Sequence, residues 1–190
     1  MSRATHIVWI DTETNGLWMD ADLLSIAMIV TTLDFDRVSH PYHAYVKRTP
    51  EESKLAFSRA TSYVRQMHMT NRLWSKVLED EARTLDVIDN DLSMMLHCIA
   101  TDYNGEATFV MGGDVLRLDQ NMVQSNLPNT FFMLDYHTFD TSVIKLFADT
   151  QYGIPAFGGY RGTHNALDDV EDAIEEAKYY RDMLEARHNH

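Results

Sequence analysis

A short apolar strand that runs directly into two acidic residues constrains this chain more than any other feature. Ile7-Val8-Trp9-Ile10 is apolar with a β-branched bias, which predicts a buried strand, and Asp11-Thr12-Glu13 follows it directly. Residues two apart on a strand point to the same side, so the Asp11 and Glu13 carboxylates should share one small volume. Two like charges at that spacing are unfavourable unless a cation lies between them. The stretch therefore predicts either a metal-binding strand end or a solvated strand end with two incidental acids.

Composition limits the size of the protein and the kind of partner it can bind. The 190 residues are 45% hydrophobic, so we expect a single domain over residues 1–185 and a frayed tail over residues 186–190. The formal net charge of −13 argues against a broad basic surface for long nucleic acid. It leaves room for a small phosphate site in which metal ions supply the positive charge.

Targeting signals and cysteine chemistry add little to the functional picture. The sequence shows no signal-peptide pattern and no apolar run long enough for a membrane span, so we expect a cytoplasmic protein with no membrane partner. Cys98, the single cysteine, lies in an apolar helical run and is expected to be a buried structural thiol.

The order of periodic segments predicts an α/β fold. Residues 23–32 and 40–46 should add two strands to the first and form a meander, and residues 108–111 should form another strand. Helical patterns occupy residues 51–78 in three short pieces, residues 84–101, a segment around Asp119, residues 141–148 and the stretch after His164. Acids on the two longest helices are expected to form solvated faces: Asp86, Asp89 and Asp91 on one, and Glu171, Asp172, Glu175 and Glu176 on the other.

Three further residues are candidates for the same chemistry as the first acidic pair. Asp119 falls among apolar positions of its helix, so either it is buried and needs a cation or a hydrogen-bonding group, or it is a surface residue of a short helix. Asp169 borders the apolar stripe of the last helix, and His164 lies at the entrance to that helix, after a Gly-rich loop over residues 153–162 that could close over a substrate. Four acids and one histidine fit two-metal hydrolysis of a phosphodiester, with a neutral histidine as the proton acceptor.

Three motifs resemble those of the DEDDh exonuclease superfamily, and the wording is most similar to its oligoribonuclease-like members. They are Asp-Thr-Glu-Thr-Asn-Gly-Leu from residue 11, an Asp in a mid-chain helix, and Gly-Thr-His-Asn-Ala-Leu-Asp-Asp from residue 162. The resemblance extends over nearly the whole chain. It implies an RNase H-like (exonuclease) fold with a mixed central sheet flanked by helices. It also implies a homodimer and 3′→5′ removal of nucleotides from short single-stranded RNA with two Mg²⁺ or Mn²⁺ ions per active site.

The resemblance also assigns roles by motif position. Asp11, Glu13, Asp119 and Asp169 would hold the metals, and His164 would be the general base. The implied substrate-binding residues are Leu17 as a wedge against a base, Tyr63 as a stacking surface, His68 at a terminal phosphate, and Tyr136 and Ser142 from the partner subunit.

The sequence departs from the family pattern at two places near the implied phosphate pocket. Gly113-Asp114-Val115 replaces Gly-Asn-Ser, and Tyr136-His137 replaces Tyr-Arg, so a hydroxyl and a fixed bidentate cation are missing. These changes favour two alternatives to dinucleotides as the substrate: the end of a longer RNA, or single-stranded DNA. An inactive nucleotide- or RNA-binding dimer is the alternative from a different class.

Overall fold

The central sheet has five strands in the order β3-β2-β1-β4-β5. The structure is a computed structural model that describes residues 4–114 and 116–188, so Val115 and residues 189–190 of the expected tail lie outside the described part. The strands are β1 (His6–Thr14), β2 (Leu23–Thr32), β3 (Tyr42–Tyr45), β4 (Phe109–Gly113) and β5 (Leu134–Asp140). The predicted meander is confirmed, because β1 pairs antiparallel with β2 and β2 with β3. β1 and β5 both run parallel to β4, which makes the sheet mixed.

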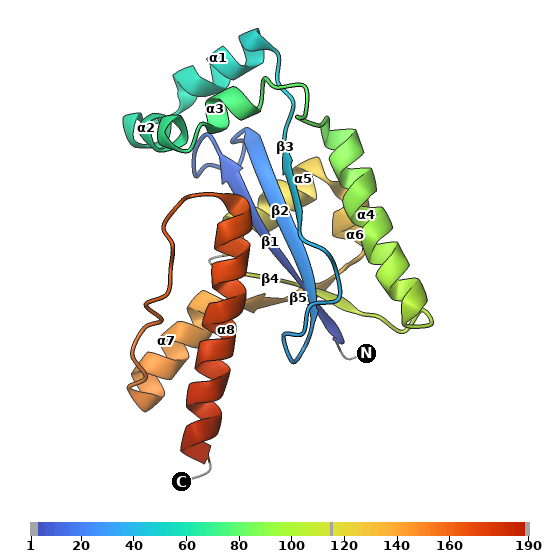
Figure 1. Ribbon diagram of the computed structural model, residues 1–190, viewed down its shortest axis with the longest axis vertical. Coiled ribbons are helices and arrows are strands. Elements are labelled where there is room, and N and C mark those ends of the chain that lie inside the picture. The colour runs from blue at the N-terminus through green and yellow to red at the C-terminus, as the bar shows by residue number, and fades with distance from the viewer. Residues whose placement is uncertain (1–3, 115, 189–190) are drawn as a thin grey trace.

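Eight helices surround the sheet in the described residues. Their bounds are α1 (Pro50–Arg59), α2 (Ser62–Thr70), α3 (Leu73–Lys76), α4 (Leu85–Asp102), α5 (Arg117–Asn126), α6 (Pro128–Phe132), α7 (Thr141–Tyr152) and α8 (Ala166–His188). Figure 1 shows α8 across one face of the sheet, α4 with α5 and α6 on the other face, and the α1–α3 group above the ends of β1 and β2. Among these helices, none combines the length and apolarity that a bilayer crossing requires.

Alternation along β1 separates the core into two layers. Val8 and Ile10 pack with α4 and α5 on one face, whereas Ile7 and Trp9 pack with α8 on the other. By the same alternation, Asp11 and Glu13 continue the face that α8 covers. The strand therefore delivers both carboxylates to the helix that carries Asp169.

Two expectations for α4 are wrong, and both errors concern the side of the helix that is buried. Cys98 is exposed. The buried stripe of α4 runs through Ile88, Leu92, Leu96 and Ile99, and Cys98, one residue before Ile99, points about 100° away from that last position around the helix axis. Asp89, expected on a solvated face, is buried and accepts hydrogen bonds from the Thr130 backbone N–H at 2.8 Å and its hydroxyl at 2.7 Å. The acid thereby caps the first turn of α6.

The acidic face expected on α8 is also partly wrong. Asp172 is buried and accepts from the Arg161 guanidinium at 2.7 Å, and Glu176 is fully buried with Lys145 Nζ 3.8 Å away. These two acids bind groups of the 153–165 loop and of α7 instead of facing water. The helix itself extends to His188, through the first three residues of the expected tail.

Candidate active site

The first two acids lie where β1 extends past its parallel neighbour. The β1–β4 ladder ends at the pair Trp9–Gly112, so Asp11 and Glu13 lie beyond the end of β4 and keep only β2 as a strand partner. Side chains at such a strand end have open space beside them while their backbone is still fixed by the sheet. The local sequence thus produces a rigid pair of carboxylates at the edge of a cavity.

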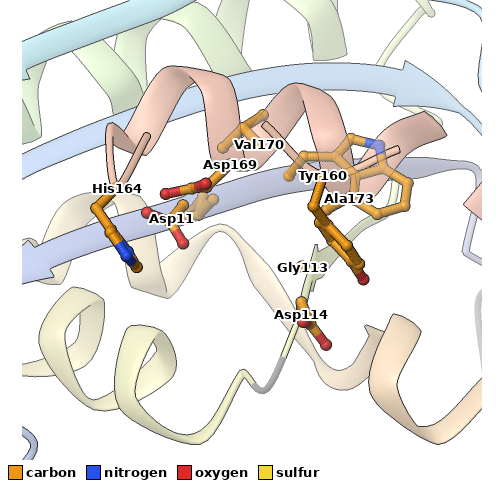
Figure 2. Close-up of a pocket in the computed structure, with 10 residues that line it drawn as sticks. Asp11, Gly113, Asp114, Tyr160, His164, Asp169, Val170 and Ala173 are labelled. Atoms are coloured by element: carbon orange, nitrogen blue, oxygen red, sulfur yellow. The ribbon is translucent and has the colours of Figure 1, made fainter. Parts of the chain in front are cut away.

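The third acid comes from the first turn of α8. Carboxylate oxygens of Asp11, Glu13 and Asp169 all lie within 4.8 Å of one another. Figure 2 shows Asp169 directly beside Asp11, with His164 next to them at the entrance to the helix. The predicted convergence of these three acids is therefore present in the structure.

Burial and nearby carboxylates raise the pKa of every acid in this cluster. The pKa of Glu13 rises to about 8, because the group is desolvated and lies near Asp169 and Asp119. The pKa of Asp169 rises to about 6, again chiefly by burial, and that of Asp11 lies well above its usual range for the same two reasons. A cluster of oxygen donors whose charges repel is the donor set that suits a hard divalent cation. The residues present therefore fit a site for a divalent metal ion.

Asp119 is buried, as predicted, and it finds a hydrogen-bonding group. Its Oδ1 accepts from the Thr12 backbone N–H at 2.9 Å and from the Thr12 hydroxyl at 2.5 Å. Burial raises the pKa of Asp119 to about 7, and these two hydrogen bonds oppose the rise. Asp119 lies outside the group of three but close enough to Asp11 to raise its pKa, so it borders the cluster on the α5 side.

His164 lies on the loop before α8 and is exposed to solvent. It shares a cavity of about 190 Å³ with Asp11, Asp114, Tyr160 and Asp169. Its electrostatic influence lowers the pKa of Asp169, which places the imidazole close to that carboxylate. An exposed imidazole beside the acids can exchange protons with solvent and with a bound group.

Asp11, Glu13, His164 and Asp169 also line a second, larger cavity of about 500 Å³. Leu17 and Tyr63 line this cavity with them. Leu17 is 86% exposed and Tyr63 is 68% exposed. The two predicted base-contacting residues are therefore available at this cavity.

His68 is placed differently from its predicted contact with a phosphate. The side chain is fully buried, its Nε2 donates to the Thr14 carbonyl at 2.9 Å, and the same atom lies 3.9 Å from Glu13 Oε2. Burial lowers the pKa of His68, which favours the neutral ring. Contact with a phosphate would require this side chain to become exposed, so the predicted role stays a prediction.

Tyr136, His137 and Ser142 belong to β5 and the start of α7, and none of them lines either cavity. His137 Nδ1 is 2.6 Å from Asp135 Oδ1, and the Ser142 hydroxyl donates to Asp140 Oδ1 at 2.5 Å. Within one chain, these three residues are thus not brought to the acids.

Tyr160 is a cavity residue that the sequence analysis did not single out. It lines the smaller cavity opposite Asp11 and Asp169, as Figure 2 shows. Burial and the nearby Glu176 carboxylate raise its pKa above the usual range. Its position in a Gly-rich loop just before His164 was the one sequence feature that could have indicated a role at the site. Nothing in the spacing indicated the direction of its ring.

Comparisons with known proteins agree with this geometry. Residues 8–177 match the family model described as Exonuclease. The chain is 30% identical to an oligoribonuclease of Mycobacterium tuberculosis over 183 residues, covering 93% of this chain and 80% of that one. It is 27% identical to an oligoribonuclease of Cutibacterium acnes over 182 residues, covering 94% and 85%.

The fold is similar to that of a larger exonuclease. The zinc-bound complex of Escherichia coli exonuclease I with single-stranded DNA has a TM-score of 0.60 and 14% identity over 93% of this chain. This chain spans about two fifths of that protein, 40% of its length. On the family match and the 30% relative, the chain belongs to the exonuclease family, as an oligoribonuclease-like member of the DEDDh 3′→5′ exonuclease superfamily.

Proposed function

We propose that this protein removes nucleotides from the 3′ end of short single-stranded oligoribonucleotides in a reaction that requires divalent metal ions. The observation that carries the proposal is the convergence of the Asp11, Glu13 and Asp169 oxygens within 4.8 Å beside His164. The relatives named oligoribonuclease support short RNA as the substrate class.

Asp11, Glu13, Asp119 and Asp169 would hold two Mg²⁺ or Mn²⁺ ions. When bound, such ions lower the pKa of an attacking water and stabilise the charge on the leaving oxygen. The acids would fix the positions of the ions, and through them the scissile phosphate, because all four are attached to a central strand or to helices that pack on it. The raised pKa values also mean that the site binds protons in place of cations when no metal is available.

In this proposal, His164 accepts the proton of the attacking water on a ring nitrogen. Its exposure lets the proton pass to solvent afterwards. The exposed Leu17 and Tyr63 would contact the bases, since a flat ring and an apolar edge accept any base without reading its sequence. The net charge of −13 favours short substrates with few phosphates.

We further propose that two copies of this chain associate through β5 and α7. Both elements carry large apolar side chains with high exposed fractions, among them Tyr136 at 72%, Val143 at 62% and Leu146 at 63%. Figure 1 shows α7 beside α8, and Val143, Leu146 and Phe147 of α7 stay exposed in the single chain. Across such an interface, Tyr136, His137 and Ser142 could reach the partner's cavity.

A digestion experiment tests the proposed reaction. Three 5′-labelled substrates would be incubated with Mg²⁺: an RNA dinucleotide, a longer single-stranded RNA and the matching DNA. We expect the dinucleotide to be cut fastest by the wild-type protein and not at all by Asp11→Asn, which keeps the side-chain shape but loses the charge that a metal needs. Asp86→Asn, an exposed acid of α4, is the matched control and should keep full activity.

The outcomes separate the alternatives. Stepwise trimming of the longer RNA or of the DNA while the dinucleotide persists would identify a related exonuclease with a different substrate. Activity retained in Asp11→Asn would contradict the metal site, and substrate binding without cleavage by the wild-type protein would indicate a binding module.

A further inference from the structure

Asn71 links two segments that lie on opposite sides of the site. It follows α2 and precedes α3, and its Oδ1 accepts a hydrogen bond from the Leu73 backbone N–H at 3.1 Å. Its Nδ2 donates to the backbone carbonyl of His164 at 2.6 Å, across 93 positions of sequence. One side chain thus holds the α2–α3 turn and the backbone of the proposed general base together.

The backbone at His164 is in a conformation that needs support. His164 has a φ of 51° and Gly162, two residues earlier, has a φ of 64°. The first value is unfavourable for a residue with a Cβ atom, and such conformations persist only where the surroundings hold them. A change of this φ would swing the imidazole away from Asp11 and Asp169.

Two residues of the loop that carries His164 attach this loop to the start of α8. The Thr163 hydroxyl donates to Asp168 Oδ2 at 2.7 Å, and Arg161 Nη1 donates to Asp168 Oδ1 at 3.0 Å. These contacts hold the residues that flank His164 against the start of α8. The bond from Asn71 adds a contact from the opposite wall, where Asn71, Tyr63 and His164 line a cavity of about 570 Å³.

We propose that Asn71 is a positioning residue that fixes the backbone of His164 and thereby aims its imidazole at the metal-binding acids. The inference rests on the proposed role of His164 as general base. It also connects two parts of the substrate site, because α2 carries Tyr63 on its first turn and is followed directly by Asn71. The helix that contacts the bases would then also hold the group that accepts the proton.

Two substitutions separate positioning from folding. Asn71→Ser keeps an oxygen that can accept from the Leu73 N–H, but it is too short to reach the His164 carbonyl. Asn71→Asp keeps the shape and the capping oxygen, but it places an acceptor against that carbonyl. Because small displacements of a catalytic group are costly, we expect kcat to fall by about 10-fold to 100-fold in both variants, with KM nearly unchanged.

Asn126→Ser is the matched control, since Asn126 Nδ2 also donates to a backbone carbonyl, that of Met122, at 2.9 Å. We expect its kcat to equal that of the wild type. Equal melting temperatures for Asn71→Ser and Asn126→Ser would show that the loss of kcat is not a loss of folded protein.

A double-mutant comparison gives the decisive readout. If Asn71 acts through His164, then Asn71→Ser should cause no further loss in a His164→Ala background. A loss of equal size in both backgrounds, or a wild-type kcat for Asn71→Ser and Asn71→Asp, would overturn the inference while leaving the proposed function intact. Wild-type activity in His164→Ala would instead overturn the general-base assignment, and the positioning role with it.

Discussion

The two carboxylates at the end of β1 are held in fixed positions by the fold, although their negative charges repel each other when both are ionised. Asp11 and Glu13 are fixed by a strand that is hydrogen-bonded along its full length to β2, so they cannot separate when both are ionised. The nearby Glu13 carboxylate is therefore one cause of the raised pKa of Asp11. The sequence spacing alone predicted the pair, since alternation along a strand has only one outcome for positions two apart.

A pH dependence of stability follows from these pKa values. The pKa of Glu13 is about 8 in the folded protein and near 4.5 when unfolded, so the unfolded state releases its proton first as the pH rises. The contribution of Glu13 to the stability of the metal-free protein should therefore be largest below about pH 4.5. It should be lost as the pH rises from there through about 8. One pKa unit corresponds to about 1.4 kcal/mol, so the fall is on the order of a few kcal/mol.

Urea denaturation between about pH 5 and pH 9, with and without Mg²⁺, measures this effect. Glu13→Gln should flatten the metal-free curve, and Mg²⁺ should stabilise the wild type more at high pH than at low pH. A wild-type curve whose slope is unchanged by Glu13→Gln would contradict the assignment.

At the scale of elements, the periodicity of apolar residues predicted the strands and helices. It did not predict which acids are buried against groups of other elements. The strands of the meander and the long helices were expected from alternation and from apolar stripes, and each is present within a few residues of its expected bounds. Asp89, Asp172 and Glu176 were wrongly placed in solvent, because the groups that stabilise them lie on other elements. Nothing local in the sequence marks an acid whose donor is 41 residues away.

The capping of α6 by Asp89 leads to a stability prediction. Removal of the carboxylate in Asp89→Ala leaves the N–H groups of Asn129 and of the buried Thr130 without their acceptor. We expect the free energy of unfolding to fall by about 2–3 kcal/mol, as is typical for unsatisfied buried donors. Chemical denaturation measures the change, and Asp86→Ala on the exposed side of α4 should alter it by less than about 0.5 kcal/mol.

For the whole molecule, the site forms where the ends of several strands and helices come together. The sequence gives the order of these elements along the chain but not their arrangement in space. Asp11, Glu13, Asp169 and His164 were predicted to converge, and the structure brings them together. Tyr160 was missed because loop conformation decides its direction. Tyr136, His137 and Ser142 line neither cavity beside the acids of their own chain, and the partner-subunit role that the resemblance implies for Tyr136 and Ser142 stays a prediction.

Association between two copies is testable at the exposed side of α7. Leu146→Glu introduces a charge where the proposed interface would be desolvated, so sedimentation should shift from dimer to monomer. Met94→Glu alters an exposed apolar residue of α4 and should leave the dimer unchanged. A wild-type protein that sediments as a monomer at micromolar concentration would contradict the proposed interface.

The different supports of the acids and of His164 have a consequence for how the protein loses activity. Asp11 and Glu13 lie on an interior strand, so they leave their places only when the whole domain opens. His164 lies on an exposed loop whose attachment can open locally, in a fluctuation far smaller than global unfolding. Mild heat or low denaturant should therefore separate two events, with hydrolysis lost while the metal-binding half of the site is still intact.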